Sequence, residues 1–137
     1  MNIVNVGEAN DTVADLAVRW ERDVLAWYPE WLSIFIGIND VWRSIDFLSG
    51  GETHVSLQEY TNQLKELVST KKDSLQGLVV MTPYYIHADR ADRMRSMMDQ
   101  YSDAVREIAE EQKVILVDTQ AEFDRVMRIR AAKSLAE

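Results

Sequence analysis

Short apolar runs alternate with amphipathic segments along the chain. Three runs have the length and continuous apolar character of strands that are covered on both faces: residues 31–38, 78–82 and 114–117. A fourth segment, residues 1–6, is rich in β-branched side chains and runs into turn-forming residues. We therefore expect a strand at the amino terminus as well.

Helices are expected between these runs. Apolar side chains recur at helical spacing over residues 13–27, and Pro29 ends that helix. Two more helices begin at residue pairs with the spacing of a capping box: Ser56 with Glu59, and Thr119 with Glu122. A long amphipathic segment, residues 91–112, carries a methionine stripe that we interpret as core packing.

The alternation of strands and helices predicts a single α/β domain over residues 1–137. Parallel strands joined by right-handed helical crossovers give a three-layer α/β/α sandwich with a parallel sheet. Residues 39–55, which include Gly50 and Gly51, predict a long loop with a short helical turn near residues 41–47.

The composition excludes several classes of function. Among 137 residues, 15 Lys and Arg oppose 23 Asp and Glu, and the formal net charge is −8. This acidity argues against nucleic acid and anionic membrane as partners. No apolar run is long enough to cross a bilayer, and no secretory signal is visible. Because cysteine is absent, we expect no disulfide, thiol nucleophile or thiolate metal site, which favours a cytoplasmic location.

Titratable and nucleophilic side chains away from the strand ends form no recognisable site. Spacings typical of zinc or calcium ligands are absent from the sequence, so we expect no metal and no cofactor. His54 and His87 are interpreted as solvated loop residues. Four serines lack the Gly-x-Ser-x-Gly surroundings of an activated nucleophile: Ser33, Ser44, Ser49 and Ser56.

Polar clusters follow three of the predicted strands, where α/β proteins place their functional groups. These clusters are residues 7–11, 37–40 and 82–85. In the second cluster, Gly37-Ile-Asn39-Asp40, a side-chain amide at the mouth of the sheet has the chemistry to donate a hydrogen bond to a developing oxyanion. The alternative interpretation is that Asn39 and Asp40 cap a turn.

Larger side chains next to these clusters are candidates for a pocket wall. Trp42 and Arg43 directly follow Asp40, and we expect Trp42 to line an acyl or sugar pocket. Arg43 either binds a substrate carboxylate or pairs with an internal acid such as Asp46. Tyr84, with Tyr85 beside it, is a further wall candidate, although aromatic residues in such places often serve packing alone.

Several segments, in order, resemble the SGNH or GDSL-type esterase and lipase family. The run Asn5-Val-Gly-Glu-Ala-Asn10-Asp-Thr12 is similar to the second block of the family, Asn-x-Gly-x-x-Gly-Asp-Thr. Gly37-Ile-Asn39-Asp40 matches the third block, Gly-x-Asn-Asp. Residues 56–67, 81–83 and 117–118 and the methionine-rich helix are similar to later elements of the family. The resemblance covers nearly the whole chain.

The resemblance implies ester hydrolysis through a serine nucleophile, a histidine base oriented by an aspartate, and an oxyanion hole that includes Asn39. The second-block glycine that donates its backbone N–H to the oxyanion corresponds to Asn10. Asparagine has the same N–H and tolerates left-handed backbone better than most residues. The implied site is therefore Asn39 and Asn10 as oxyanion donors, with a pocket formed by five residues: Gly37, Asp40, Trp42, Arg43 and Tyr84. A small ester would be the substrate.

The sequence departs from the family at both ends. The Gly-Asp-Ser block that follows the first strand and the Asp-x-x-His block that follows the last strand are absent from it. We therefore expect an incomplete SGNH-hydrolase-like domain without its first strand, inactive or nearly so alone. Loss of that central strand leaves three outcomes: direct pairing of the flanking strands, a detached amino-terminal segment, or homo-oligomers that pair exposed sheet edges.

Two other functions are compatible with parts of the pattern. One is a non-catalytic α/β module that retains the pocket for a ligand or partner. The other is a flavodoxin-like domain that binds a phosphate at its strand ends. The sequence disfavours the second, because it has no glycine-rich phosphate loop with a lysine.

Overall fold

The computed structural model describes residues 1–48, 55–71 and 75–136. Three strands form the sheet: β1 (Trp31–Phe35), β2 (Gly77–Met81) and β3 (Ile115–Val117). The helices are α1 (Val13–Arg19), α2 (Ile38–Leu48), α3 (Leu57–Lys71), α4 (Arg93–Gln112) and α5 (Thr119–Ala136). A π-helical turn (Trp20–Val24) and a 3₁₀ turn (Leu25–Trp27) extend α1. Ser49, Gly50, Gly51 and His54 lie outside the described residues.

The sheet is parallel, with strand order β1-β2-β3. In its register Trp31 lies opposite Gly77, and Val79 lies opposite Ile115. The α/β class and the parallel sheet predicted from the sequence are therefore confirmed. Each of the three apolar runs contains a strand. The expected cover on both faces is wrong for two of them, because β3 is exposed along its length and Trp31 and Phe35 of β1 are exposed.

One face of the sheet is covered by helices. Side chains that alternate along β1 and β2, such as Ile34 and Val80, face α3 and α4 and are buried. The helices contribute the rest of the core, and Tyr60 of α3 packs on Tyr101 of α4 with ring centroids 4.9 Å apart. The methionine-rich helix does supply core side chains, among them the fully buried Met98.

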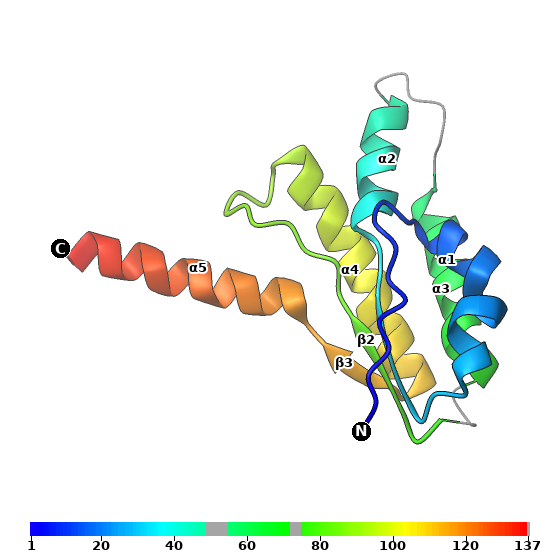
Figure 1. Cartoon of the computed structure of the whole chain (residues 1–137). Coiled ribbons are helices and arrows are strands. Elements are labelled where there is room, and N and C mark those ends of the chain that lie inside the picture. Colours follow the sequence, from blue (N-terminus) through cyan, green and yellow to red (C-terminus); the bar gives the residue numbers. More distant parts are fainter. Residues whose placement is uncertain (49–54, 72–74, 137) are drawn as a thin grey trace.

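The opposite face of the sheet is covered only in part. Phe123 in the first turns of α5 stacks on Tyr84, which in turn stacks on Phe35 of β1. Beyond this stack α5 projects away from the sheet (Figure 1), and most of its surface is exposed. Trp31 and Ile115 on this face are 58% and 49% exposed.

The amino-terminal segment differs from the prediction. Residues 1–6 form no strand, and Met1 and Ile3 are exposed. A strand exists only through hydrogen bonds to a neighbour, and the segment pairs with no strand among the described residues. Its junction with α1 is nevertheless fixed, because Arg19 donates to the Val6 carbonyl at 2.7 Å. Within this chain the amino-terminal segment therefore lies outside the sheet, and it does not pair directly with β1 as one of the expected outcomes required.

Residues 39–55, which were expected to be mostly loop, also differ from the prediction. Residues Ile38–Leu48 form a full helix, α2, rather than a short turn near residues 41–47. Val41 on this helix is completely buried, and α2 packs against α4. The sequence does contain helical spacing here, because Ile38, Val41 and Ile45 recur at i, i+3 and i+7. A loop was expected instead because Gly50 and Gly51 fall in the same stretch.

Candidate active site

Gly37 makes the turn that carries β1 into α2. Its backbone has φ +136°, a conformation that residues with a side chain rarely adopt. A Cβ at this position would lie 2.8 Å from the Tyr60 hydroxyl and 3.0 Å from the Pro83 ring. Tyr60 donates its hydroxyl to the Ile36 carbonyl at 2.8 Å. The turn is therefore held closely against α3, and it places Asn39 in the first turn of α2.

Asn39 and Asn10 lie at the same place in the fold, although nearly thirty residues separate them. The Asn39 amide donates to the carbonyl of Asp11 at 3.0 Å. Asn10, the preceding residue, has left-handed backbone with φ 70°. An amide nitrogen carries two hydrogens, so this bond orients the group while the second N–H remains to donate elsewhere. The two residues predicted as oxyanion donors are thus neighbours.

Asp40 lies buried next to Asn39 and holds the start of α1. Both of its carboxylate oxygens accept from the backbone N–H of Val13, at 3.0 and 3.2 Å, and its side chain is completely buried. Burial raises the pKa of Asp40 to about 6, and the Val13 N–H opposes that shift. Asp40 was expected on the pocket surface, but the structure places it beneath the surface, where it ties the start of α1 to α2.

Arg43 fastens the other side of the Asn10 turn. Its guanidinium donates to the Asn10 carbonyl at 3.0 Å and lies 3.8 Å from the Asp15 carboxylate. The sequence suggested either a substrate carboxylate or an internal acid such as Asp46 as its partner. The acid that it meets is Asp15, whose pKa is lowered mainly by the backbone N–H of Thr12.

The two aromatic wall candidates have different surroundings. Trp42, in the first turns of α2, is 61% exposed and follows Asn39 closely along the helix. Tyr84 lies in the aromatic stack between Phe35 and Phe123, with centroids 6.0 and 4.5 Å away. The stack gives Tyr84 a packing position at the end of the sheet, whereas Trp42 presents its ring to solvent.

The serines and the histidine that the structure describes form no nucleophile and base. The buried Ser44 hydroxyl has two carbonyl acceptors within reach for its one hydrogen, those of Asp40 at 2.9 Å and Val55 at 2.8 Å, and lies 3.2 Å from the Tyr101 hydroxyl. Ser56 caps α3, and the His87 ring lies against the backbone of Asp89. Among the residues described, no group of three or more His, Asp or Glu could hold a metal ion. No helix in the described ranges is long and apolar enough to span a membrane.

One buried ion pair could not be predicted from the sequence. Arg95 of α4 is 1% exposed and donates to Asp124 of α5 at 2.7 Å, to Asp99 at 2.8 Å and to the His87 carbonyl. The only local signal was the helical i,i+4 spacing of Arg95 and Asp99. The contact with α5 joins segments far apart in sequence, and no pattern along the chain indicates it.

Comparison with known proteins extends these observations. The sequence model of the GDSL-like lipase/acylhydrolase family matches residues 1–134. An acetylxylan esterase from Geobacillus stearothermophilus is 46% identical over 136 residues, which are 99% of this chain and 62% of that protein. The chain therefore spans less than two thirds of the length of this relative.

Solved structures agree with the sequence comparison. The crystal structure of Axe2, an acetylxylan esterase from Geobacillus stearothermophilus, is 49% identical with a TM-score of 0.87, over 91% of this chain and 57% of that one. LAE5, an alpha/beta hydrolase enzyme from the metagenome of Lake Arreo, has the same TM-score and coverage at 42% identity. By fold and by sequence, the chain belongs to the GDSL-like lipase/acylhydrolase family.

Proposed function

We propose that the chain is part of an SGNH-type hydrolase domain that removes acetyl groups from a sugar ester, with Asn39 and Asn10 as donors of the oxyanion hole. The observation that carries the proposal is the hydrogen bond from the Asn39 amide to Asp11, which holds that amide beside the turn of Asn10. The similarity to an acetylxylan esterase supports the class of substrate.

The chemistry follows from where charge develops. When a nucleophile attacks the ester carbonyl, the C=O electrons move to the oxygen, which becomes an oxyanion until the alcohol leaves. The Asn39 amide and the backbone N–H of Asn10 are the donors that stabilise this charge. Because Asp40 and Arg43 fix the surrounding backbone, the donors need no rearrangement as the charge forms.

The nucleophile and the base are proposed to come from segments outside these 137 residues. The positions of Ser44 and His87 support this proposal, since the first is buried against Tyr101 and the second lies on the loop between β2 and α4, whereas Asn39 lies in α2. A hydrolase without nucleophile and base retains only the stabilisation that its oxyanion donors provide. We therefore propose that the 137-residue chain alone does not turn over esters.

The exposed ring of Trp42 is proposed as the wall that meets the sugar of the substrate. An aromatic ring packs well against the C–H face of a sugar, and Trp42 lies on the same helix as Asn39, about one turn away. The proposed site therefore comprises a polar end at Asn39 and an apolar wall at Trp42.

The experiment that tests the proposal is an ester hydrolysis assay of the folded 137-residue chain. The substrates are p-nitrophenyl acetate and acetylated xylo-oligosaccharides, and Asn39→Ala is the control variant. We expect no turnover above the control. We also expect the chain to bind the oligosaccharide weakly and saturably, and Trp42→Ala to abolish this binding. Turnover that depends on Asn39 would show that the chain contains its own nucleophile, and would contradict the proposed incompleteness.

A further inference from the structure

The turn that carries Asn10 is closed by the side chain of Arg19. Arg19 is the last residue of α1, and helical side chains point back toward the start of their helix. Its guanidinium donates from Nη1 to the Val6 carbonyl at 2.7 Å and from Nε to the Asp11 carboxylate at 2.8 Å. Arg19 therefore joins the residue that enters the turn to the residue that leaves it.

These contacts are largely shielded from water. The side chains of Arg19 and Asp11 are 12% and 18% exposed, so solvent and salt screen this pair less than a pair on the surface. Asp23, in the turn that follows α1, lies 3.7 Å from the same guanidinium. The guanidinium therefore faces groups of the protein rather than solvent.

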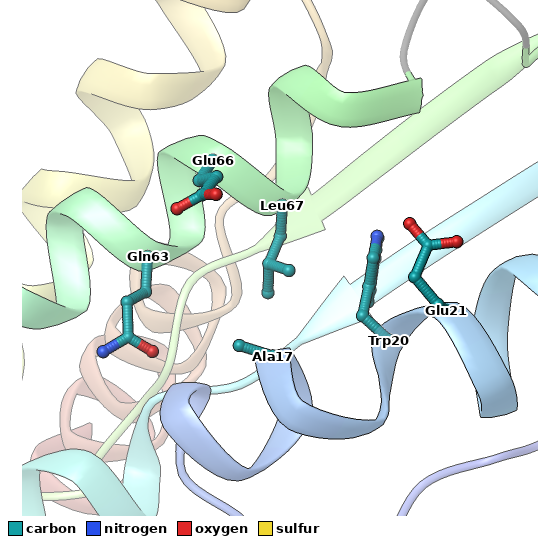
Figure 2. A pocket seen from close by; sticks show the side chains of 6 residues that line it. All are labelled: Ala17, Trp20, Glu21, Gln63, Glu66 and Leu67. Atoms are coloured by element: carbon teal, nitrogen blue, oxygen red, sulfur yellow. The ribbon is translucent and has the colours of Figure 1, made fainter.

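The helix that carries Arg19 is itself fixed in place. It packs against α3, and Figure 2 shows Leu67 of α3 pointing toward Ala17 of α1. Trp20, which follows Arg19, projects toward α3 and is 4% exposed. Because α1 is anchored on this side, the guanidinium has a fixed position from which to hold the turn.

The entry to the turn depends on this contact more than its exit does. Residues 1–6 pair with no strand among the described residues, so the sheet does not set their direction. The side chain of Val6 packs against the core, but apolar contact is non-directional. The exit is held by Asn39 and Arg43, which donate to the carbonyls of Asp11 and Asn10. Arg19 supplies a directional contact at the entry.

We propose that Arg19 is a positioning residue of the oxyanion hole, which closes the turn so that the Asn10 N–H and the Asn39 amide point at the same site. The inference rests on the proposed function, in which both groups donate to the oxyanion. A backbone N–H turns with its planar peptide unit, so a shift of Val6 relative to Asp11 would redirect the Asn10 donor. Misplacement by about 1 Å costs a reaction about 10²-fold in rate.

An arginine suits this role better than a lysine. The N–H groups of a guanidinium diverge in one plane, so they reach two acceptors at once. A lysine ammonium is a point charge on a flexible stem, and it would hold one end of the turn. Arg19→Lys keeps the charge without the two-ended contact, and Arg19→Met keeps only the apolar length of the side chain.

The first test is the ¹⁵N NMR spectrum of the folded 137-residue chain and its variants. The backbone N–H of Asn10 and the side-chain amide of Asn39 report directly on the geometry of the turn. We expect both signals to shift in Arg19→Met and to shift less in Arg19→Lys. Arg125→Met breaks an exposed pair on α5 and should leave both signals in place. Signals that do not move in Arg19→Met would overturn the proposal.

The second test measures the rate. Residues 1–134 would replace the matching segment of the Geobacillus stearothermophilus acetylxylan esterase, and the chimera would be assayed on p-nitrophenyl acetate. Arg19→Met should lower kcat per folded molecule by about tenfold to a hundredfold. KM should change by less than about twofold, because the lost interaction serves the transition state. A purely structural role would reduce the folded fraction and leave kcat per folded molecule unchanged, which would overturn the proposal.

Two further variants of the chimera complete the test. Asn39→Ala tests the proposed function separately. If it lowers kcat and Arg19→Met does not, the oxyanion hole stands and the positioning role of Arg19 is wrong. If Asn39→Ala leaves kcat unchanged, the proposed function is wrong, and the role of Arg19 in it falls as well. Full activity of Arg19→Lys would show that charge alone suffices, and would overturn the two-ended closure of the turn.

Discussion

At the scale of single residues, the candidate site depends on three groups that act on the backbone rather than on substrate. Gly37 permits the turn, Asp40 ties down the N–H of Val13, and Arg43 holds the carbonyl of Asn10. These three residues fix the backbone around Asn39 and Asn10, and with it the position of the Asn39 amide. Removing any of them should therefore affect stability as well as geometry.

The raised pKa of Asp40 predicts a specific pH dependence. Because the folded state raises this pKa to about 6, it binds a proton more tightly than the unfolded chain does. The stabilisation of the folded state by the protonated Asp40 is fully present below the pKa of the unfolded chain, and it is lost as pH rises through about 6. Asp40→Asn keeps the acceptor for Val13 without the charge, so its stability relative to the wild type should be about 2 kcal/mol greater at about pH 7.5 than at about pH 4.5.

Urea unfolding of both proteins at the two pH values, followed by tryptophan fluorescence, measures this difference. A stability difference between variant and wild type that does not change with pH would contradict the assignment of a buried, proton-binding Asp40.

Gly37 offers a second prediction at this scale. Gly37→Ala places a Cβ 2.8 Å from the Tyr60 hydroxyl in a backbone conformation unsuited to alanine, so the free energy of unfolding should fall by about 2–3 kcal/mol. Gly7→Ala is the matched control, because it meets only a side-chain oxygen of Asn5 at 3.1 Å on an exposed segment. Thermal unfolding compares the two. An equal loss of stability in the two variants would show that the left-handed backbone of Gly37 does not contribute specifically to the free energy of unfolding.

At the scale of helices and strands, α5 is fixed at one end only. Its beginning is held by the Arg95–Asp124 ion pair and the Tyr84–Phe123 stack, whereas its second half is exposed. A helix with one anchored end should open from the other end first. The buried pair is therefore one of the contacts that join α5 to the rest of the fold, beside the aromatic stack and the hydrogen bonds of Gln120 to Thr82 and Tyr85.

Removing one partner of this pair should be costly. Arg95→Met leaves the Asp124 carboxylate with Gln120 and the exposed Arg90 as its remaining partners, and the expected loss is about 1.5–3 kcal/mol, the range for a hydrogen bond to a charged group. Arg125→Met breaks an exposed pair with Glu122 on the same helix and should change stability by less than about 1 kcal/mol. Denaturant unfolding gives both values, and hydrogen exchange shows whether the amides of α5 lose protection first. A small effect of Arg95→Met would mean that α5 is held by its apolar contacts instead.

Local patterns predicted some elements and missed others for physical reasons. The apolar runs that contain β1, β2 and β3 and the stripe of α4 were visible because each repeats the period of its own element. The prediction of a strand at residues 1–6 was wrong because a strand needs a neighbouring strand to pair with, and no local sequence pattern shows whether one is present. Residues 1–6 form no strand, so the closeness of Asn39 to Asn10 followed only from the family resemblance, which makes both residues oxyanion donors. The burial of Asp40 did not, because its partner lies 27 residues away.

At the scale of the whole molecule, the second face of the sheet has consequences for association. Exposed apolar side chains gather on this face, including Trp31, Phe35 and Ile115, and the outer edge of β1 pairs with no described strand. Such surfaces associate, because self-contact buries apolar area and pairs backbone groups. We propose that the 137-residue chain forms dimers through this face.

Sedimentation velocity over a range of concentrations tests the dimer. We expect the dimer fraction to rise with concentration, and Phe35→Lys to abolish it by placing a charge on the face. Val18→Lys is the control, because Val18 is exposed on α1, away from the sheet. A monomer at every concentration, or equal effects of the two variants, would contradict association through the sheet.

The most direct test of the central claim supplies the chain with the segments that its relatives have. Residues 1–134 would replace the matching segment of the Geobacillus stearothermophilus acetylxylan esterase, and the chimera would be assayed on acetylated xylo-oligosaccharide with and without Asn39→Ala. If Asn39 donates to the oxyanion, the chimera is active and the variant loses about 10²–10³-fold in kcat with little change in KM. A folded chimera that is inactive, or whose kcat does not depend on Asn39, would contradict the account.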